Sequence, residues 1–122
     1  MSRLLLAVFF LVLIGCGKSV DITEYRYLGD QPFEREAWGD GLPGDRSKMV
    51  YSFLHENEPI TKLTKRQIIS ELGKPTTYYV QEYFPAYLIE HEGKKYVLAF
   101  SLEGNESTSQ VKNVYVEEYQ RN

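Results

Sequence analysis

The chain has 122 residues, and its 17 acidic side chains outnumber its 14 lysines and arginines, for a formal net charge of −3. This length suits a single domain around one core and is too short for two. Because the chain is mildly acidic and has no basic stripe, its composition argues against a nucleic-acid partner.

The N-terminus has the order of a secretory signal. Arg3 precedes an unbroken apolar run from Leu4 to Ile14, and Gly15 provides a small residue before a cleavage point. The run is shorter than the roughly 20 residues that a helix needs to cross a bilayer, so it is not a lasting anchor. We therefore expect residues 1–15 to be a signal peptide.

Leu13-Ile14-Gly15-Cys16 resembles the lipobox of bacterial lipoproteins. The resemblance implies that Cys16 carries a diacylglycerol, that cleavage occurs before it, and that an acyl chain such as palmitate is added to the new amine. The mature chain would then be tethered to a membrane that it does not enter. This places it in the bacterial cell envelope. The alternative is an ordinary signal peptide with a chance cysteine, or a buried structural thiol.

The residue after the cysteine bears on the choice of membrane. It is Gly17 and not the aspartate that retains Gram-negative lipoproteins at the inner membrane. The resemblance therefore implies the periplasmic face of the outer membrane, if the cell is Gram-negative.

Residues 16–43 are expected to form a tether and an extended N-terminal segment, because glycines and prolines interrupt any regular element there. Phe33 and Trp38 lie in this segment. Two interpretations remain open for them. They contact a partner, or they fold back and cover one end of the domain, since large aromatic side chains are mostly buried.

An apolar stripe of helical period predicts a first helix that begins near Asp45 and ends at Asn57 and Pro59. The stripe consists of Met49, Val50, Phe53 and Leu54. We expect it to face the core.

A second helix is predicted from Lys65 to Leu72. Thr64 and Gln67 have the spacing of a capping box, which satisfies free backbone amides at a helix N-terminus. Gly73 suits the left-handed position that follows a helix, and Pro75 prevents continuation.

After Pro75 the period changes to two, and four strands are predicted. They span residues 76–83, 87–91, 94–102 and 111–119. Glu92-Gly93 fits a tight hairpin, and counting outward from it pairs Ile89 with Tyr96 and Tyr87 with Leu98. This register places Tyr87, Ile89, Tyr96, Leu98 and Phe100 under the helices, with Glu90 and Lys95 facing water.

Two helices followed by antiparallel strands predict an α+β fold, with both helices on one face of a three- to four-stranded antiparallel meander. The pattern from Leu63 to Pro75, followed by Tyr96-x-Leu98-x-Phe100-x-x-x-Gly104, resembles the SmpA/OmlA (BamE-like) lipoproteins. That resemblance implies the same fold, also found in β-lactamase inhibitor proteins, over a domain of residues 44–122. It also implies a role like that of the accessory subunits of the outer-membrane barrel-assembly machine.

Catalysis is not expected. The sequence contains two histidines, His55 and His91, and no phosphate loop, HExxH or GxSxG motif. A two-histidine metal site would lack identified further ligands. We therefore assign no catalytic residue, no metal ligand and no cofactor.

Two non-catalytic functions remain. The chain is an accessory or protein-binding module in outer-membrane protein assembly or envelope integrity, with an envelope protein as partner. Alternatively, it is an inhibitor or ligand-sensing module that acts on an envelope enzyme. The hypothesised binding residues are the aromatic side chains left outside the core, which would flank a sheet edge open to an added strand. They are Phe33, Trp38, Tyr78, Tyr79 and Tyr83.

Overall fold

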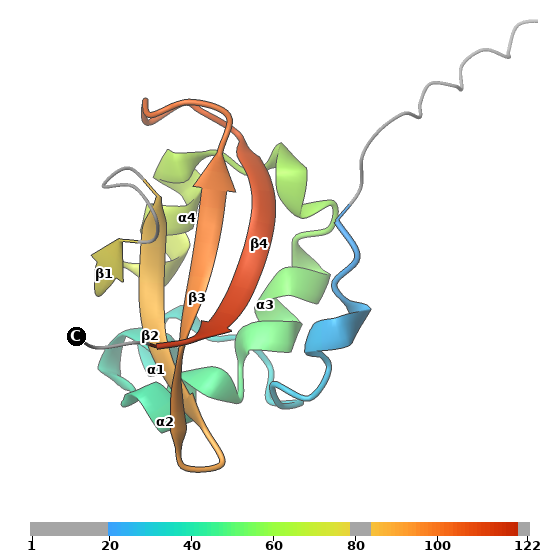
Figure 1. The fold of residues 1–122 in the computed structure, drawn as a ribbon, viewed down its shortest axis with the longest axis vertical. Helices are drawn as coiled ribbons and strands as arrows, with labels where there is room; N and C mark the ends of the chain where they lie inside the picture. The colour runs from blue at the N-terminus through green and yellow to red at the C-terminus, as the bar shows by residue number, and fades with distance from the viewer. Residues whose placement is uncertain (1–19, 79–83, 120–122) are drawn as a thin grey trace, which may run out of the picture.

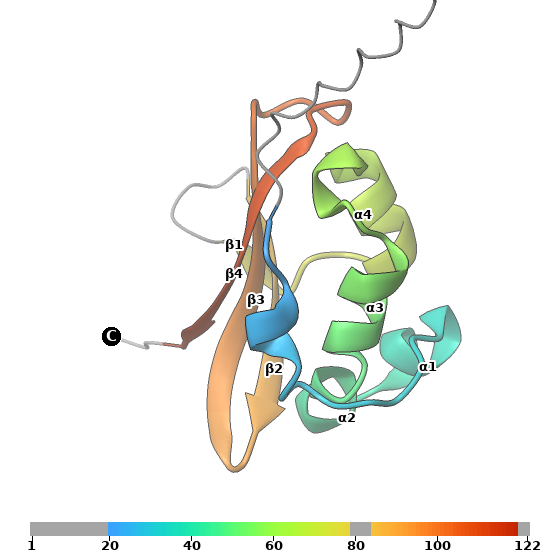
Figure 2. The same cartoon turned by 90° about the vertical axis from the view of Figure 1, so that its right-hand side faces the viewer.

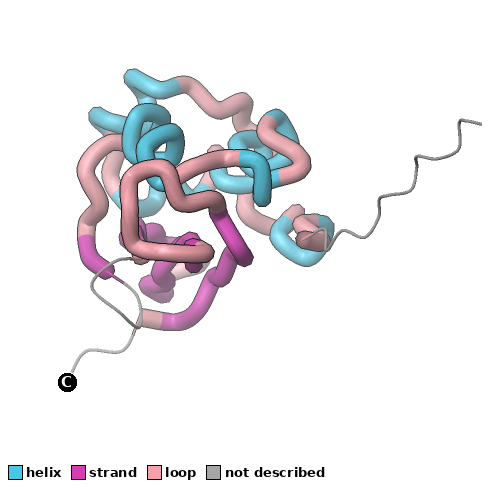
Figure 3. The backbone as a smooth tube through the Cα atoms, turned by 90° about the horizontal axis from the view of Figure 1, so that it is seen from above, coloured by secondary structure: helices cyan, strands magenta, loops and turns pink. Residues whose placement is uncertain are grey.

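The computed structural model describes residues 20–78 and 84–119, and these form two layers (Figure 1). Four α-helices lie on one face of an antiparallel sheet, and the opposite face carries no described helix (Figure 2). Helices and strands occupy separate layers when seen from above (Figure 3). The predicted α+β class is confirmed.

The predicted first helix is interrupted. Its sequence forms α2 (Pro43–Ser47) and α3 (Val50–Glu56), separated by Lys48 and Met49. The carbonyl of Lys48 accepts a hydrogen bond from the amide of Gln31 at 3.1 Å, so it does not join a continuous helical ladder. Gly29 makes this approach possible, because a Cβ atom there would lie 2.3 Å from the Lys48 oxygen.

The second helix, α4, spans Lys65–Leu72, with the predicted bounds. The Thr64 hydroxyl accepts from the Gln67 amide at 3.3 Å, and the Thr64 amide donates to the Gln67 side chain at 2.9 Å. Gly73 follows with a φ of 83°. The amides of Lys65 and Arg66 donate to carbonyls of Ser109 and Ser107, both at 2.9 Å, so the loop between the last two strands completes the helix cap. Two shorter elements, η4 (Ile60–Lys62) and α1 (Arg35–Asp40), flank the two main helices.

The sheet has the strand order β1-β2-β3-β4. Its strands are β1 (Thr77–Tyr78), β2 (Pro85–His91), β3 (Lys94–Leu102) and β4 (Val111–Glu118). The predicted pairs Ile89 with Tyr96, Tyr87 with Leu98 and Glu90 with Lys95 are confirmed. The hairpin is as expected, since Glu92 and Gly93 both have positive φ. Of the predicted strand 76–83, residues 79–83 lie outside the described part.

The core lies between the helices and the sheet. Tyr87, Ile89, Leu98 and Phe100 are fully buried there, and the half-buried Tyr96 packs against the same cluster. The helix-free face holds a smaller cluster of Ala86, Val97 and Ala99, against which Tyr115 packs. The predicted assignment of side chains to the two faces is therefore confirmed.

Part of the segment expected as a tether packs against the domain. A short turn of 3-10 helix, η3 (Thr23–Tyr25), begins this part of the chain. Four side chains of the segment belong to the main core, and they are Ile22, Tyr25, Leu28 and Trp38. The folded unit therefore includes residues well before the expected boundary at residue 44, because these side chains bury their apolar surface against the sheet and helices.

Candidate interaction surface

Trp38, predicted as a contact for a partner, lies inside the domain. Its side chain is 0% exposed, and its indole N–H donates to the carbonyl of Leu72 at 2.9 Å. The guanidinium of Arg46 lies 5.2 Å from the ring centroid. Trp38 thus packs inside the domain, as the interpretation in which it folds back onto the domain expects.

Phe33 is half-buried beside Trp38 and Phe53, with ring-centroid distances of 6.0 and 5.0 Å. Tyr78 belongs to β1, the edge strand, which pairs with β2 over two residues. Tyr79, Tyr83 and Cys16 lie outside the described residues. Among the described members of the hypothesised set, Phe33 and Trp38 pack against each other.

A groove lies at the other edge of the sheet, between the N-terminal segment and the start of β4. Its volume is about 820 Å³. Asp21, Glu24 and Tyr25 line one side, residues 110–114 line the other, and Lys62 of η4 lies at its margin. We call this surface the β4 groove.

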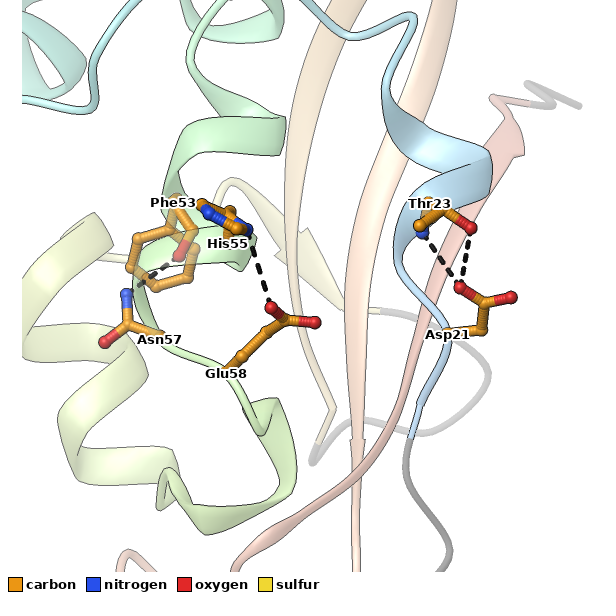
Figure 4. Close-up of polar contacts among 6 residues, drawn as sticks. All are labelled: Asp21, Thr23, Phe53, His55, Asn57 and Glu58. Atoms are coloured by element: carbon orange, nitrogen blue, oxygen red, sulfur yellow. Dashed lines mark hydrogen bonds and ion pairs between the residues drawn. The ribbon is translucent and has the colours of Figure 1, made fainter.

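Burial of every third residue positions the N-terminal side of the β4 groove. Ile22 and Tyr25 enter the core, which leaves Asp21 and Glu24 exposed. Asp21 accepts two hydrogen bonds from Thr23, one from the hydroxyl at 2.7 Å and one from the amide at 3.1 Å (Figure 4). These bonds lower the pKa of Asp21, because they favour its charged carboxylate.

Tyr25 ties the segment to β4. Its hydroxyl donates to the carbonyl of Val114 at 3.2 Å. Burial raises the pKa of Tyr25 to about 12, and the nearby charge of Glu24 adds to the shift. The neutral phenol is therefore the form that the folded protein favours.

This shift predicts a loss of stability at alkaline pH. The folded-state pKa of Tyr25 exceeds its ordinary value of 10.0. The contribution of Tyr25 to the free energy of unfolding is therefore present below pH 10 and is lost as the pH rises toward about 12. Between about pH 9 and about pH 11, the free energy of unfolding should fall less in Tyr25→Phe than in the parent. Equal slopes for the two proteins would contradict the assignment of this shift to Tyr25.

The two histidines lie in different places. His55 of α3 stacks on Tyr51 and lies 3.5 Å from a carboxylate oxygen of Glu58 (Figure 4). His91 lies at the β2–β3 hairpin, and its ring centroid is 5.2 Å from that of Tyr27. Among the described residues, no group of three or more histidine, cysteine, aspartate or glutamate side chains is placed to hold a metal ion.

The β4 groove was not predicted, and four of its lining residues come from the predicted tether: Val20, Asp21, Glu24 and Tyr25. A signal was present, because Ile22, Tyr25 and Leu28 recur at every third residue, the spacing of one side of a tight helical turn. The segment was too short and too rich in turn residues for this spacing to predict an element. Tyr27 lies between Tyr25 and Leu28 and falls outside this spacing, and its side chain is 48% exposed.

Comparison of the chain with known protein families, with curated proteins and with solved structures found no match. In the described part of the chain, no helix has both the length and the apolar character required to cross a membrane.

Proposed function

We propose that this protein is a lipid-anchored, non-catalytic binding module of the bacterial envelope, and that the β4 groove contacts its protein partner. The lipobox-like sequence at Cys16 motivates the anchor. The observation that carries the binding function is the β4 groove itself, a concave surface built from four separate stretches of the chain.

The chemistry of the β4 groove suits a protein segment. Exposed acidic side chains at Asp21, Glu24 and Glu103 stand near basic ones at Lys62 and Lys112. Such mixed charges around a partly apolar floor resemble the polar rim of a protein–protein interface. A nucleic acid would require a mainly basic surface.

The β4 groove would also lie close to the membrane. Four peptide steps separate Cys16 from Val20, which lines the groove. At about 3.8 Å per step, lipid on Cys16 would hold Val20 within about 15 Å of its attachment point. A partner in the same membrane, or bound to it, is therefore favoured. The resemblance to BamE-like lipoproteins supports outer-membrane protein assembly as the process.

The test is affinity purification of the tagged chain from detergent-solubilised membranes. We expect the parent to recover a membrane protein or complex, and Glu24→Lys combined with Glu103→Lys to recover at least about fivefold less of it. The control combines Glu36→Lys with Asp40→Lys, which makes the same charge change on α1, away from the groove. Equal recovery by the groove variant would contradict the proposal.

The same preparation tests the anchor and the alternative function. Cys16→Ser should leave the membrane fraction, and a variant that sediments with membranes as tightly as the parent would refute lipidation. Recovery of a single soluble hydrolase, without a membrane component, would instead favour the inhibitor function.

A further inference from the structure

β4 is the last of the described strands in the sheet, so one of its edges has no neighbouring strand among them. The amide of Tyr119 donates to the carbonyl of Lys95 at 2.9 Å, which sets the alternation of hydrogen bonds along β4. In an antiparallel ladder every second residue points its backbone groups away from the partner strand. Val114, Val116 and Glu118 are those residues in β4.

The first part of this edge is closed by the protein itself. The Val114 amide donates to the side chain of Asn113 at 2.8 Å, and its carbonyl accepts from Tyr25. The Val111 amide donates to the carbonyl of Leu63 at 2.8 Å. No added strand can pair here without displacing these contacts.

The second part of the edge is open. Within the described residues, the outward backbone groups of Val116 and Glu118 form no hydrogen bond. Val116 is half-buried, and the residues that follow it are exposed. Figure 2 shows this end of β4 bending away from the helices and from the N-terminal segment. Unpaired backbone groups in a row form a template for an extended chain.

The charges around this open edge are mainly negative. Glu117 and Glu118 are both exposed on β4. Glu24 is exposed next to Tyr25, whose hydroxyl bonds to Val114 on the same strand. At the same end of the sheet, Lys95 on β3 stands opposite Glu90 on β2, and Lys94 stands opposite His91.

We propose that the edge of β4 from Val116 to Glu118 accepts a basic, extended segment of the partner protein as an added strand. This inference rests on the proposed function and names the part of the partner that binds. A second copy of the chain is a poor occupant, since edge-to-edge pairing would bring its glutamates against Glu117 and Glu118 of the first copy. On the other side of the sheet, α2 packs beside β2, and β1 pairs with the start of that strand.

The probe is a synthetic peptide in which lysine and valine alternate, added to the full chain purified in detergent. We expect it to slow hydrogen exchange of the Val116 and Glu118 amides by about tenfold or more at saturation, measured by NMR. A peptide in which glutamate and valine alternate should leave both exchange rates unchanged. Raised salt should weaken binding of the lysine peptide, because exposed charges are screened.

Two variants separate backbone pairing from charge. Val116→Pro removes an outward amide that makes no hydrogen bond within the sheet. In this variant the lysine peptide should no longer protect the Glu118 amide from hydrogen exchange. Val116→Thr retains the amide and should bind the peptide like the parent. Circular dichroism establishes that both variants are folded. Glu117→Lys combined with Glu118→Lys should raise the dissociation constant of the lysine peptide by about tenfold.

The inference is overturned if the lysine peptide protects neither amide, if the glutamate peptide binds equally, or if folded Val116→Pro binds as tightly as Val116→Thr. These readouts do not depend on recovery of a membrane partner. Failure of the strand-addition site is therefore distinguishable from failure of the proposed function.

Discussion

Trp38→Ala is expected to lower the free energy of unfolding by about 3 to 5 kcal/mol. The indole is fully buried, its N–H is bonded to the carbonyl of Leu72, and its ring meets that of Tyr87 at a centroid distance of 6.1 Å. The substitution removes a large apolar surface, leaves a cavity between α1 and α4, and leaves a buried carbonyl without its donor. Urea unfolding followed by circular dichroism measures the change.

Leu42→Ala is the matched control for this variant. Leu42 is also a large apolar residue of the N-terminal segment, but it is 72% exposed, so its truncation should change stability by no more than about 0.5 kcal/mol. If Trp38→Ala unfolds at the urea concentration of the parent, Trp38 does not hold the segment to the domain. Where the variant stays folded, its partner recovery should match the parent's, since a buried ring cannot contact a partner.

Phe100→Ala is expected to cost a similar amount, about 3 to 5 kcal/mol. Phe100 is fully buried at the centre of β3. Its ring meets those of Phe53 and Tyr87 at centroid distances of 6.4 and 6.5 Å, so it joins α3 to the sheet. Removing it withdraws contacts from both layers at once.

Lys95→Ala is the control for Phe100→Ala. It lies on the same strand but is exposed, and its truncation should change stability by no more than about 0.5 kcal/mol. An unfolding midpoint for Phe100→Ala equal to that of the parent would mean that the register places this side chain on the wrong face of the sheet.

The elements that the sequence predicted accurately are those built from local interactions. The bounds of α4 follow from Thr64, Gln67 and Gly73, which act on backbone groups within a few residues of themselves. The register of β2 and β3 follows from a two-residue hairpin, because a tight turn leaves the strands one way to pair. Each of these signals is complete in a short stretch of sequence.

The candidate surface was only partly predictable. The sequence predicts strand addition at the edge formed by the first strand, with exposed aromatic side chains as the contacts for the partner. In the structure the aromatic Trp38 is buried, and the open part of an edge carries Glu117 and Glu118 on the last strand. Which edge is closed depends on Tyr25 reaching Val114, and no local pattern encodes that contact.

The sequence by itself therefore determined the helix caps, the hairpin register and the two faces of the sheet. The tertiary structure alone decided that residues 20–43 belong to the domain and that a groove forms beside β4. The physical reason is the range of the contacts. The Tyr25 hydroxyl bonds to a residue 89 positions away and the Trp38 indole to one 34 positions away. Such contacts exist only after the sheet and helices have assembled, so the short local pattern in this segment was not enough to predict them.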